Sequence, residues 1–214
     1  MLARAIRLAF DPYGRERQNR LAVAKGTEPG VDPRQFGPTA TDEQWDRYRS
    51  DSAVHRTYWI AQWPRLAVGP MFLAPLLLST DVVRSLSVVL EPVSPDRARR
   101  SVEAAITSDL ADEEIRAERG FRTTARRRKR SDAVLRREQE LAGGHQEFRF
   151  AAYVTVSAGD DQRLELACDH VEQAAHQAYL DIQPLWGEQD AAFTFGALPI
   201  ARGLNPSGPF AGAA

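Results

Sequence analysis

One stretch, FRFAAYVTVSA at residues 148–158, constrains the fold more than any other part of the chain. Its side chains alternate in character, which is typical of a β-strand with one buried face. The predicted buried face consists of Phe148, Phe150, Ala152, Val154 and Val156. The opposite face is at least half polar, so we expect a sheet with helices packed on one of its faces.

The other segments predict an α+β fold, because strands alternate with helices along the chain. Further strands are expected at residues 54–63, 82–93 and 180–186. Helices or helical turns are expected at residues 2–10, 41–48, 69–78, 94–119, 124–142, 160–180 and 187–199. The order predicts a mostly antiparallel sheet of about four strands, with a protruding helical hairpin at residues 95–142.

Composition divides the chain into three parts. Residues 1–40 combine a short helix with an arm rich in Gly and Pro, and this arm has too few apolar residues to build a core. Residues 41–204 carry the predicted α+β domain. Residues 205–214 are a Gly- and Pro-containing tail that we expect to be disordered.

The charge of the chain is segregated, although its net value is only −1. Residues 116–137 hold ten Lys or Arg against two acids, a local charge of +8 that leaves about −9 for the remainder. Five consecutive cations interrupt the apolar stripe of the second hairpin helix, and we expect them to project into solvent. They are Arg126, Arg127, Arg128, Lys129 and Arg130.

Three kinds of partner suit this basic run: DNA phosphates, an anionic membrane leaflet or an acidic protein surface. A fourth interpretation needs no partner. In that case the basic side chains are solvated and pair with acids on the opposite helix of the hairpin, namely Asp112, Glu113, Glu114 and Glu118.

Several active-site motifs are missing from the sequence. It contains no Gly-Lys pair for a phosphate-binding loop, no Gly-x-Gly-x-x-Gly, no His-Glu-x-x-His, no Cys-x-x-Cys and no Gly-x-Ser-x-Gly. The single Cys168 excludes an internal disulfide and is typical of a small apolar residue on a helix face. We therefore predict no enzyme activity, no catalytic or metal-binding residue and no cofactor.

Three weaker signals are open to two interpretations each. His145-Gln146-Glu147 matches half of a zinc deaminase signature, but the cysteine half is absent and coincidence is favoured. Cys168, His170 and His176 lie at helix positions that do not converge on one metal. The aromatic residues Tyr58, Trp59 and Trp63 could stack nucleic-acid bases, but core packing is favoured.

The most apolar stretch, LAVGPMFLAPLLLST at residues 66–80, is too short to span a membrane. A spanning helix needs about 18 continuous apolar residues, and this stretch is also interrupted by Gly69, Pro70 and Pro75. The start of the chain lacks the features of a secretory signal. We therefore expect a soluble chain.

Five segments together resemble a known family: AIRLAFDP (5–12), EQWDRYRSDSAVHRTYWIAQWPR (43–65), FLAPLLLSTDVVRSLSVVLEPVSPDRARRSVEAAITSDLADEE (72–114), GHQEFRFAAYVTVSA (144–158) and LWGEQDAAFTFGALPIARGL (185–204). The set is similar to the C-terminal half of actinobacterial membrane-anchored proteins encoded in conjugative, type IV secretion-like loci beside a conjugation ATPase. It also resembles the N-terminal, non-motor domain of conjugation ATPases. In those proteins a Leu-Pro element, here Leu198-Pro199, leads into the motor.

The resemblance implies a non-catalytic assembly module on the cytoplasmic side of a membrane, docking to its ATPase, to other secretion subunits or to itself. Relatives usually begin with two transmembrane helices and a further α/β region that do not precede Met1, so we expect a fragment or truncated product. Ala201 stands where the closing motif usually has Gly. The alternative hypothesis is a nucleic-acid-binding protein that acts through the basic hairpin, and an enzyme ranks third.

Overall fold

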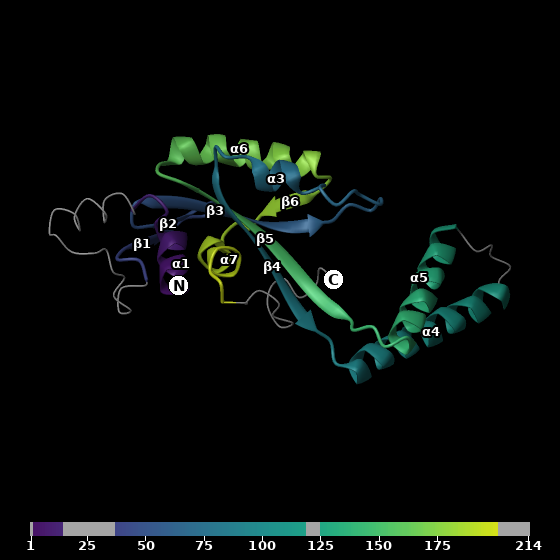
Figure 1. Cartoon of the computed structure of the whole chain (residues 1–214). Helices are drawn as coiled ribbons and strands as arrows, with labels where there is room; N and C mark the ends of the chain where they lie inside the picture. Colours follow the sequence, from purple (N-terminus) through teal and green to yellow (C-terminus); the bar gives the residue numbers. More distant parts are fainter. Residues whose placement is uncertain (1, 15–36, 119–124, 201–214) are drawn as a thin grey trace, which may run out of the picture. The chain divides into compact units, whose positions relative to one another are not determined.

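The computed structural model describes residues 2–14, 37–118 and 125–200, with side chains left out at residues 2–4, 109–118 and 125–130. It has an α+β architecture (Figure 1). The described strands are β1 (Thr41–Glu43), β2 (Tyr48–Ser50), β3 (Ala53–Gln62), β4 (Val83–Pro92), β5 (Phe148–Ala158) and β6 (Asp181–Pro184). The described helices are α1 (Leu2–Phe10), α3 (Ala74–Leu78), α4 (Pro95–Glu118), α5 (Ala125–Ala142), α6 (Asp161–Gln177) and α7 (Gln189–Gly196).

The chain divides into two compact units. The first, which we call the sheet unit, comprises Met1–Val89 and Ala151–Ala214. The second, which we call the helical unit, comprises Leu90–Phe150 and contains α4 and α5.

The strands form one six-stranded sheet in the order β1-β2-β3-β5-β4, and β6 also pairs with β3. Every pairing with a defined register is antiparallel. The expectation of a mostly antiparallel sheet is therefore confirmed. The sheet has six strands instead of about four, because the short strands β1 and β2 were not expected.

Strand β3 is the centre of the sheet unit. One of its edges pairs with β5 from Val54 to Trp59, whereas β2 and β6 share the other edge. The side chain of Gln189 fills the gap between these two strands. It accepts a hydrogen bond from the Thr57 amide at 2.8 Å and donates to the Thr57 carbonyl at 3.3 Å. A glutamine from α7 thus satisfies the backbone of a buried central strand.

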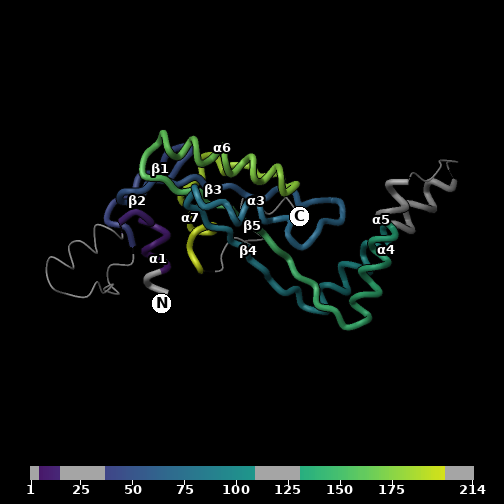
Figure 2. The backbone as a smooth tube through the Cα atoms, turned by 45° about the horizontal axis from the view of Figure 1, so that its top comes forward, coloured from purple at the N-terminus to yellow at the C-terminus, as the bar shows by residue number. Residues whose placement is uncertain are grey.

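Helices cover both faces of the sheet unit, as the two views in Figures 1 and 2 show. On one face α6 contributes Leu164, Cys168 and Val171 to a core with Val54 and Val156. The expectation that helices pack on one face is therefore wrong for this unit.

The second face is covered by α7 and α1. The ring centroid of Phe193 from α7 lies 5.2 Å from that of Phe10 in α1 and 4.6 Å from that of His55 in β3. Polar side chains on this face are buried but paired. Thr57 Oγ1 lies 2.9 Å from Thr155 Oγ1, so the half-polar face of β5 is an interior surface that hydrogen bonds make tolerable.

The helix expected at residues 41–48 is absent, and the segment forms β1 and β2 instead. Asp51, with φ of +50°, helps to form the tight turn that brings β2 back onto β3. Pairing with β3 buries Tyr48 and Ser50, and this burial outweighs the local helix-start signal at Thr41 and Gln44.

The strand at residues 148–158 is confirmed, but its predicted apolar face is not continuous. Phe148 and Phe150 are about half exposed, whereas Ala152, Val154 and Val156 are fully buried. Alternation therefore located the strand correctly but not the extent of its buried part.

In the helical unit, α4 and α5 pack against each other. Ala98 and Val102 on α4 are buried, as is Val93 just before this helix. Arg137 on α5 forms a bidentate ion pair with Glu147, with Nη2 2.6 Å from Oε1 and Nε 3.1 Å from Oε2.

None of the described helices combines the length and apolar composition needed to cross a bilayer. Most of the predicted N-terminal arm and all of the predicted tail at 205–214 lie outside the described residues.

Candidate interaction surface

The main candidate site is an exposed stretch in the sheet unit, residues 66–80, which we call the apolar segment. Arg65 precedes it and Asp81 follows it, and no charged residue lies between them. Leu66 is 81 % exposed, and Met71 and Leu78 are each 67 % exposed. Several exposed apolar side chains on one short segment make it a candidate interaction surface.

Other side chains of the apolar segment hold it in place. Leu76 is fully buried in the core, and Phe72 and Leu73 pack partly against the same core. Two backbone bonds, from Phe72 N to Gly69 O and from Ala74 N to Met71 O, lead the chain into α3. Because one side is anchored in this way, the exposed side is presented in a defined conformation.

A cavity of about 570 Å³ lies beside the start of the apolar segment. The segment that follows β3 lines it with four side chains, those of Trp63, Pro64, Leu66 and Val68. Residues at the end of α6 and the start of β6 line it from the other direction, and they are His176, Tyr179, Leu180 and Asp181.

The polar side chains on the rim of this cavity bond to one another. Arg65 Nη2 donates to Gln62 Oε1 at 2.8 Å, and Gln62 Nε2 donates to Asp181 Oδ2 at 3.3 Å. These bonds leave a mainly apolar interior.

Tyr179 occupies an unfavourable backbone conformation at the mouth of the cavity. Its φ is +56°, in the left-handed region, and its side chain is 72 % exposed. Two bonds after α6, from Tyr179 N to His176 O and from Leu180 N to Ala175 O, define a Schellman end. Glycine is preferred at this position, and the left-handed conformation costs a residue with a Cβ roughly 1 to 2 kcal/mol.

The predicted basic site lies in α5, which begins at Ala125. The side chains of Arg126, Arg127, Arg128, Lys129 and Arg130 are outside the described residues. Their role as an anion- or partner-binding site therefore stays a prediction.

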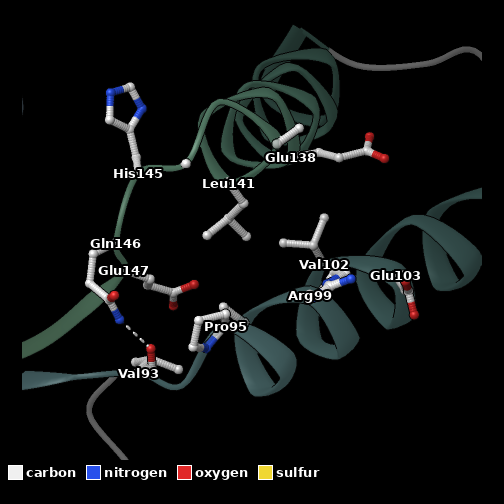
Figure 3. A pocket seen from close by; sticks show the side chains of 13 residues that line it. Val93, Pro95, Arg99, Val102, Glu103, Glu138, Leu141, His145, Gln146 and Glu147 are labelled. Carbon is white, nitrogen blue, oxygen red and sulfur yellow. Dashed lines mark hydrogen bonds between the residues drawn. The ribbon is translucent and has the colours of Figure 1, made fainter.

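The side chains of His145, Gln146 and Glu147, which match half of a zinc deaminase signature, do not converge on one point. A cavity of about 500 Å³ in the helical unit is lined by His145 and Glu147, among others (Figure 3). The His145 ring points away from the other labelled side chains, while Gln146 Nε2 donates to the Val93 carbonyl at 2.6 Å. Glu147 is held by Arg137.

The helix α6 does not bring its cysteine and histidines together. Cys168 is buried in the core, where burial raises the pKa of its thiol, whereas His170 and His176 are exposed. Among the described residues, no cluster of three or more His, Cys, Asp or Glu could hold a metal ion.

A buried Ser–His–Ser arrangement is the nearest approach to catalytic geometry in the described residues. His55 Nε2 lies 2.8 Å from Ser50 Oγ, and His55 Nδ1 lies 2.8 Å from Ser157 Oγ. Ser50 donates to the carbonyl of Phe10, so the network connects α1 to the sheet. Burial lowers the pKa of His55 to about 4. Because His55 is fully buried and lines neither cavity, its geometry fits a structural role.

The buried guanidinium of Arg56 also has its partners within the sheet unit. Arg56 Nη2 lies 2.8 Å from Glu165 Oε1 and 2.9 Å from Asp46 Oδ2. Because two carboxylates already neutralise this guanidinium, it offers little attraction to an external anion.

The aromatic residues of β3 and its end pack as favoured from sequence. Tyr58 is fully buried, while Trp59 and Trp63 pack against core clusters and are partly buried. Tyr58 donates to Glu172 at 2.9 Å.

Sequence reasoning missed the apolar segment as a surface, although the run without charges from 66 to 80 was visible. It also missed Tyr179, because a left-handed tyrosine has no signature in the sequence.

Comparison with protein-family models found no match, and comparison with curated proteins found none either.

Proposed function

We propose that this protein is a non-catalytic assembly module that docks to another protein through the apolar segment. The observation that carries this proposal is the exposure of Leu66, Met71 and Leu78 on a segment anchored by Leu76. Covering these exposed apolar side chains with a partner is favourable, because burial contributes about 25 cal/mol per Å² of apolar area.

The family resemblance suggests the setting. It points to a conjugative, type IV secretion-like apparatus at the cytoplasmic face of a membrane, with the conjugation ATPase, another secretion subunit or a second copy as partner. The apolar segment supplies a candidate contact for any of these proteins.

Co-precipitation of the purified chain with the neighbouring conjugation ATPase, together with sedimentation of the chain alone, tests the proposal. The triple variant Leu66→Gln, Met71→Gln and Leu78→Gln should weaken association at least roughly tenfold, a loss of about 1.4 kcal/mol. The matched control is Leu166→Gln, which changes an exposed leucine of α6. Absence of both ATPase binding and self-association in the wild type would contradict the proposal.

A second candidate function is nucleic-acid binding through the basic run. Ten cations against two acids in residues 116–137 favour this candidate. In this nucleic-acid-binding hypothesis, α4 and α5 form a protruding helical hairpin that presents Arg126–Arg130 to phosphates.

Replacement of these five cations by Gln should flatten the salt dependence of DNA binding, since each phosphate contact contributes about 0.9 to the slope. If the wild type does not bind DNA at low salt, this candidate is excluded.

A further inference from the structure

We propose that an exposed surface around Trp45 and Trp186 binds the basic run of a second copy of this chain. The surface, which we call the indole surface, comprises these two side chains and the carboxylates of Glu43, Glu188 and Asp190, all in the sheet unit. It shares no residue with the apolar segment. The inference therefore goes beyond the proposed function and does not rest on it.

The two indole rings are exposed, and the ring of Trp45 lies against the backbone. Trp45 is 72 % exposed and Trp186 is 48 % exposed. The Gly187 amide donates to the Trp45 carbonyl at 2.7 Å, and a Cβ at Gly187 would lie 2.7 Å from Cζ3 of Trp45. Only a glycine, here with φ of +74°, therefore allows this ring to pack so closely and still present its other side to solvent.

The arginines near these rings are already neutralised. Cζ of Arg56 lies 5.9 Å from the centroid of the Trp186 ring, but its guanidinium pairs with Asp46 and Glu165. Arg47 pairs with the same two carboxylates. The charges of both arginines are thus balanced by acids outside the indole surface.

The three acids of the indole surface have no such partner. Within the described part of the chain, neither Glu43 nor Glu188 nor Asp190 takes part in an ion pair. Desolvation and a hydrogen bond with Asp190 raise the pKa of Glu43, and the negative charges of Asp190 and Glu188 raise it further. These carboxylates therefore repel one another, and a cation placed beside them would relieve the repulsion.

An arginine-rich segment has the chemistry that this surface lacks. Carboxylates attract its charge, and guanidinium groups stack on the faces of indole rings. The chain itself contains such a segment, since residues 116–137 hold ten Lys or Arg against two acids, and the remainder carries about −9. Two copies of the chain are therefore complementary in charge, with the indole surface of one facing the basic run of the other.

Other occupants fit less well. DNA and an anionic membrane leaflet would both bring negative charge against Glu43, Glu188 and Asp190, and like charges brought together are unfavourable. An apolar partner would remove water from these carboxylates without giving them a counter-charge, which is costly.

The test is sedimentation velocity of the nuclease-treated full chain over a range of protein concentrations. The wild type should self-associate at about 0.1 M salt and dissociate at about 1 M salt, because the screening length falls from about 10 Å to about 3 Å. If the chain's own basic run covered the indole surface instead, the sedimentation coefficient would not depend on protein concentration.

The first variant combines Glu43→Gln and Glu188→Gln, which remove two charges from the indole surface with little change of shape. It should weaken self-association roughly tenfold or more at the lower salt concentration. The matched control combines Asp81→Asn and Asp169→Asn, which remove two exposed acids elsewhere in the sheet unit, and it should associate like the wild type. Equal midpoints of thermal unfolding show that the variants stay folded.

A second variant tests the ring. Trp45→Leu keeps an apolar side chain against Gly187 but removes the aromatic face, and it should weaken self-association about two- to fivefold. An unchanged association would count against the contact with Trp45, even if the charge variants behaved as expected.

A mixing experiment tests whether the contact joins two copies. A third variant, in which Arg126, Arg127, Arg128, Lys129 and Arg130 are replaced by Gln, should not self-associate. Mixed with the Glu43→Gln and Glu188→Gln variant, it should form a complex, because its indole surface and the basic run of the other variant are both intact.

Three results would overturn the inference: a monomeric wild type at the lower salt concentration, equal association of the Glu43→Gln and Glu188→Gln variant and its control, or no complex in the mixture. The triple variant of Leu66, Met71 and Leu78 separates this failure from failure of the proposed function. If association is lost in that triple variant but survives in the charge variant, the proposed function stands and this inference fails. If the reverse occurs and the ATPase does not bind, the indole surface stands and docking through the apolar segment fails.

Discussion

The sheet unit and the helical unit bury very different amounts of their helices. In the sheet unit, α6 places Leu164, Cys168, Val171 and Ala175 against the sheet. In the helical unit, the described part of α4 buries only Ala98 and Val102. The two helices differ already in sequence: α6 has an apolar stripe that packs on the sheet, whereas α4 gathers few apolar residues on one face, and its described side chains stay mostly exposed.

This difference should appear in local stability. Segments with few buried apolar contacts open at lower free energy than the core does. We therefore expect amides of α4 and α5 to exchange with solvent faster than those of β3, β5 and α6.

The largest effect should come from Leu164→Ala in α6. Leu164 is fully buried, and removing a buried leucine side chain typically costs 2 to 5 kcal/mol of unfolding free energy. Leu166→Ala on the same helix is the matched control. Leu166 is 59 % exposed, so its change should stay within about 0.5 kcal/mol in urea unfolding. Equal effects would contradict the assignment of the two faces of α6.

Acid should destabilise the sheet unit through His55. Burial lowers its folded-state pKa to about 4, below about 6.5 in the unfolded chain. The unfolded chain therefore binds this proton first, and stability is lost as pH falls from about 6.5 to about 4. The loss should approach roughly 3 kcal/mol, at 1.36 kcal/mol per pKa unit.

Urea unfolding at several pH values measures this loss, with His55→Gln as the comparison. The variant should lack that part of the pH dependence, whatever its stability at neutral pH. A wild-type slope that persists unchanged in His55→Gln would rule out His55 as its source.

Val102→Ala should act within the helical unit. Val102 is 2 % exposed, and the loss of two methyl groups corresponds to about 2 kcal/mol. Hydrogen exchange should accelerate in α4 and α5 while protection in α6 stays constant. Equal acceleration in both units would show that they open as one cooperative body.

The smallest effect should come from Arg137→Gln, which removes the ion pair with Glu147. Both side chains are partly exposed, and exposed ion pairs typically contribute below about 1 kcal/mol. Urea unfolding in low and high salt measures the effect. A loss as large as that of Val102→Ala would mean that charge, and not apolar contact, stabilises the helical unit.

Much of the secondary structure could be predicted because its causes are local. The alternation of residues 148–158 located β5, and the apolar repeat from Leu164 to Ala175 located α6. Asp160 caps the start of that helix, since its side chain accepts a hydrogen bond from the Arg163 amide. The candidate site was much less predictable, because the exposure of Leu66 and the cavity beside Tyr179 depend on which surfaces remain uncovered after folding.

Local sequence patterns were enough to locate most helices and strands, the segregated charge and the absence of several active-site motifs. Folding was needed to show that residues 41–50 pair as strands, that α7 and α1 cover the polar face of β5, and that Tyr179 takes a left-handed conformation. The two sets of features differ in the distance along the chain over which the responsible interactions act. Periodicity and capping act over a few residues, whereas burial and hydrogen-bond satisfaction depend on partners such as Gln189 and Thr57, which lie 132 positions apart.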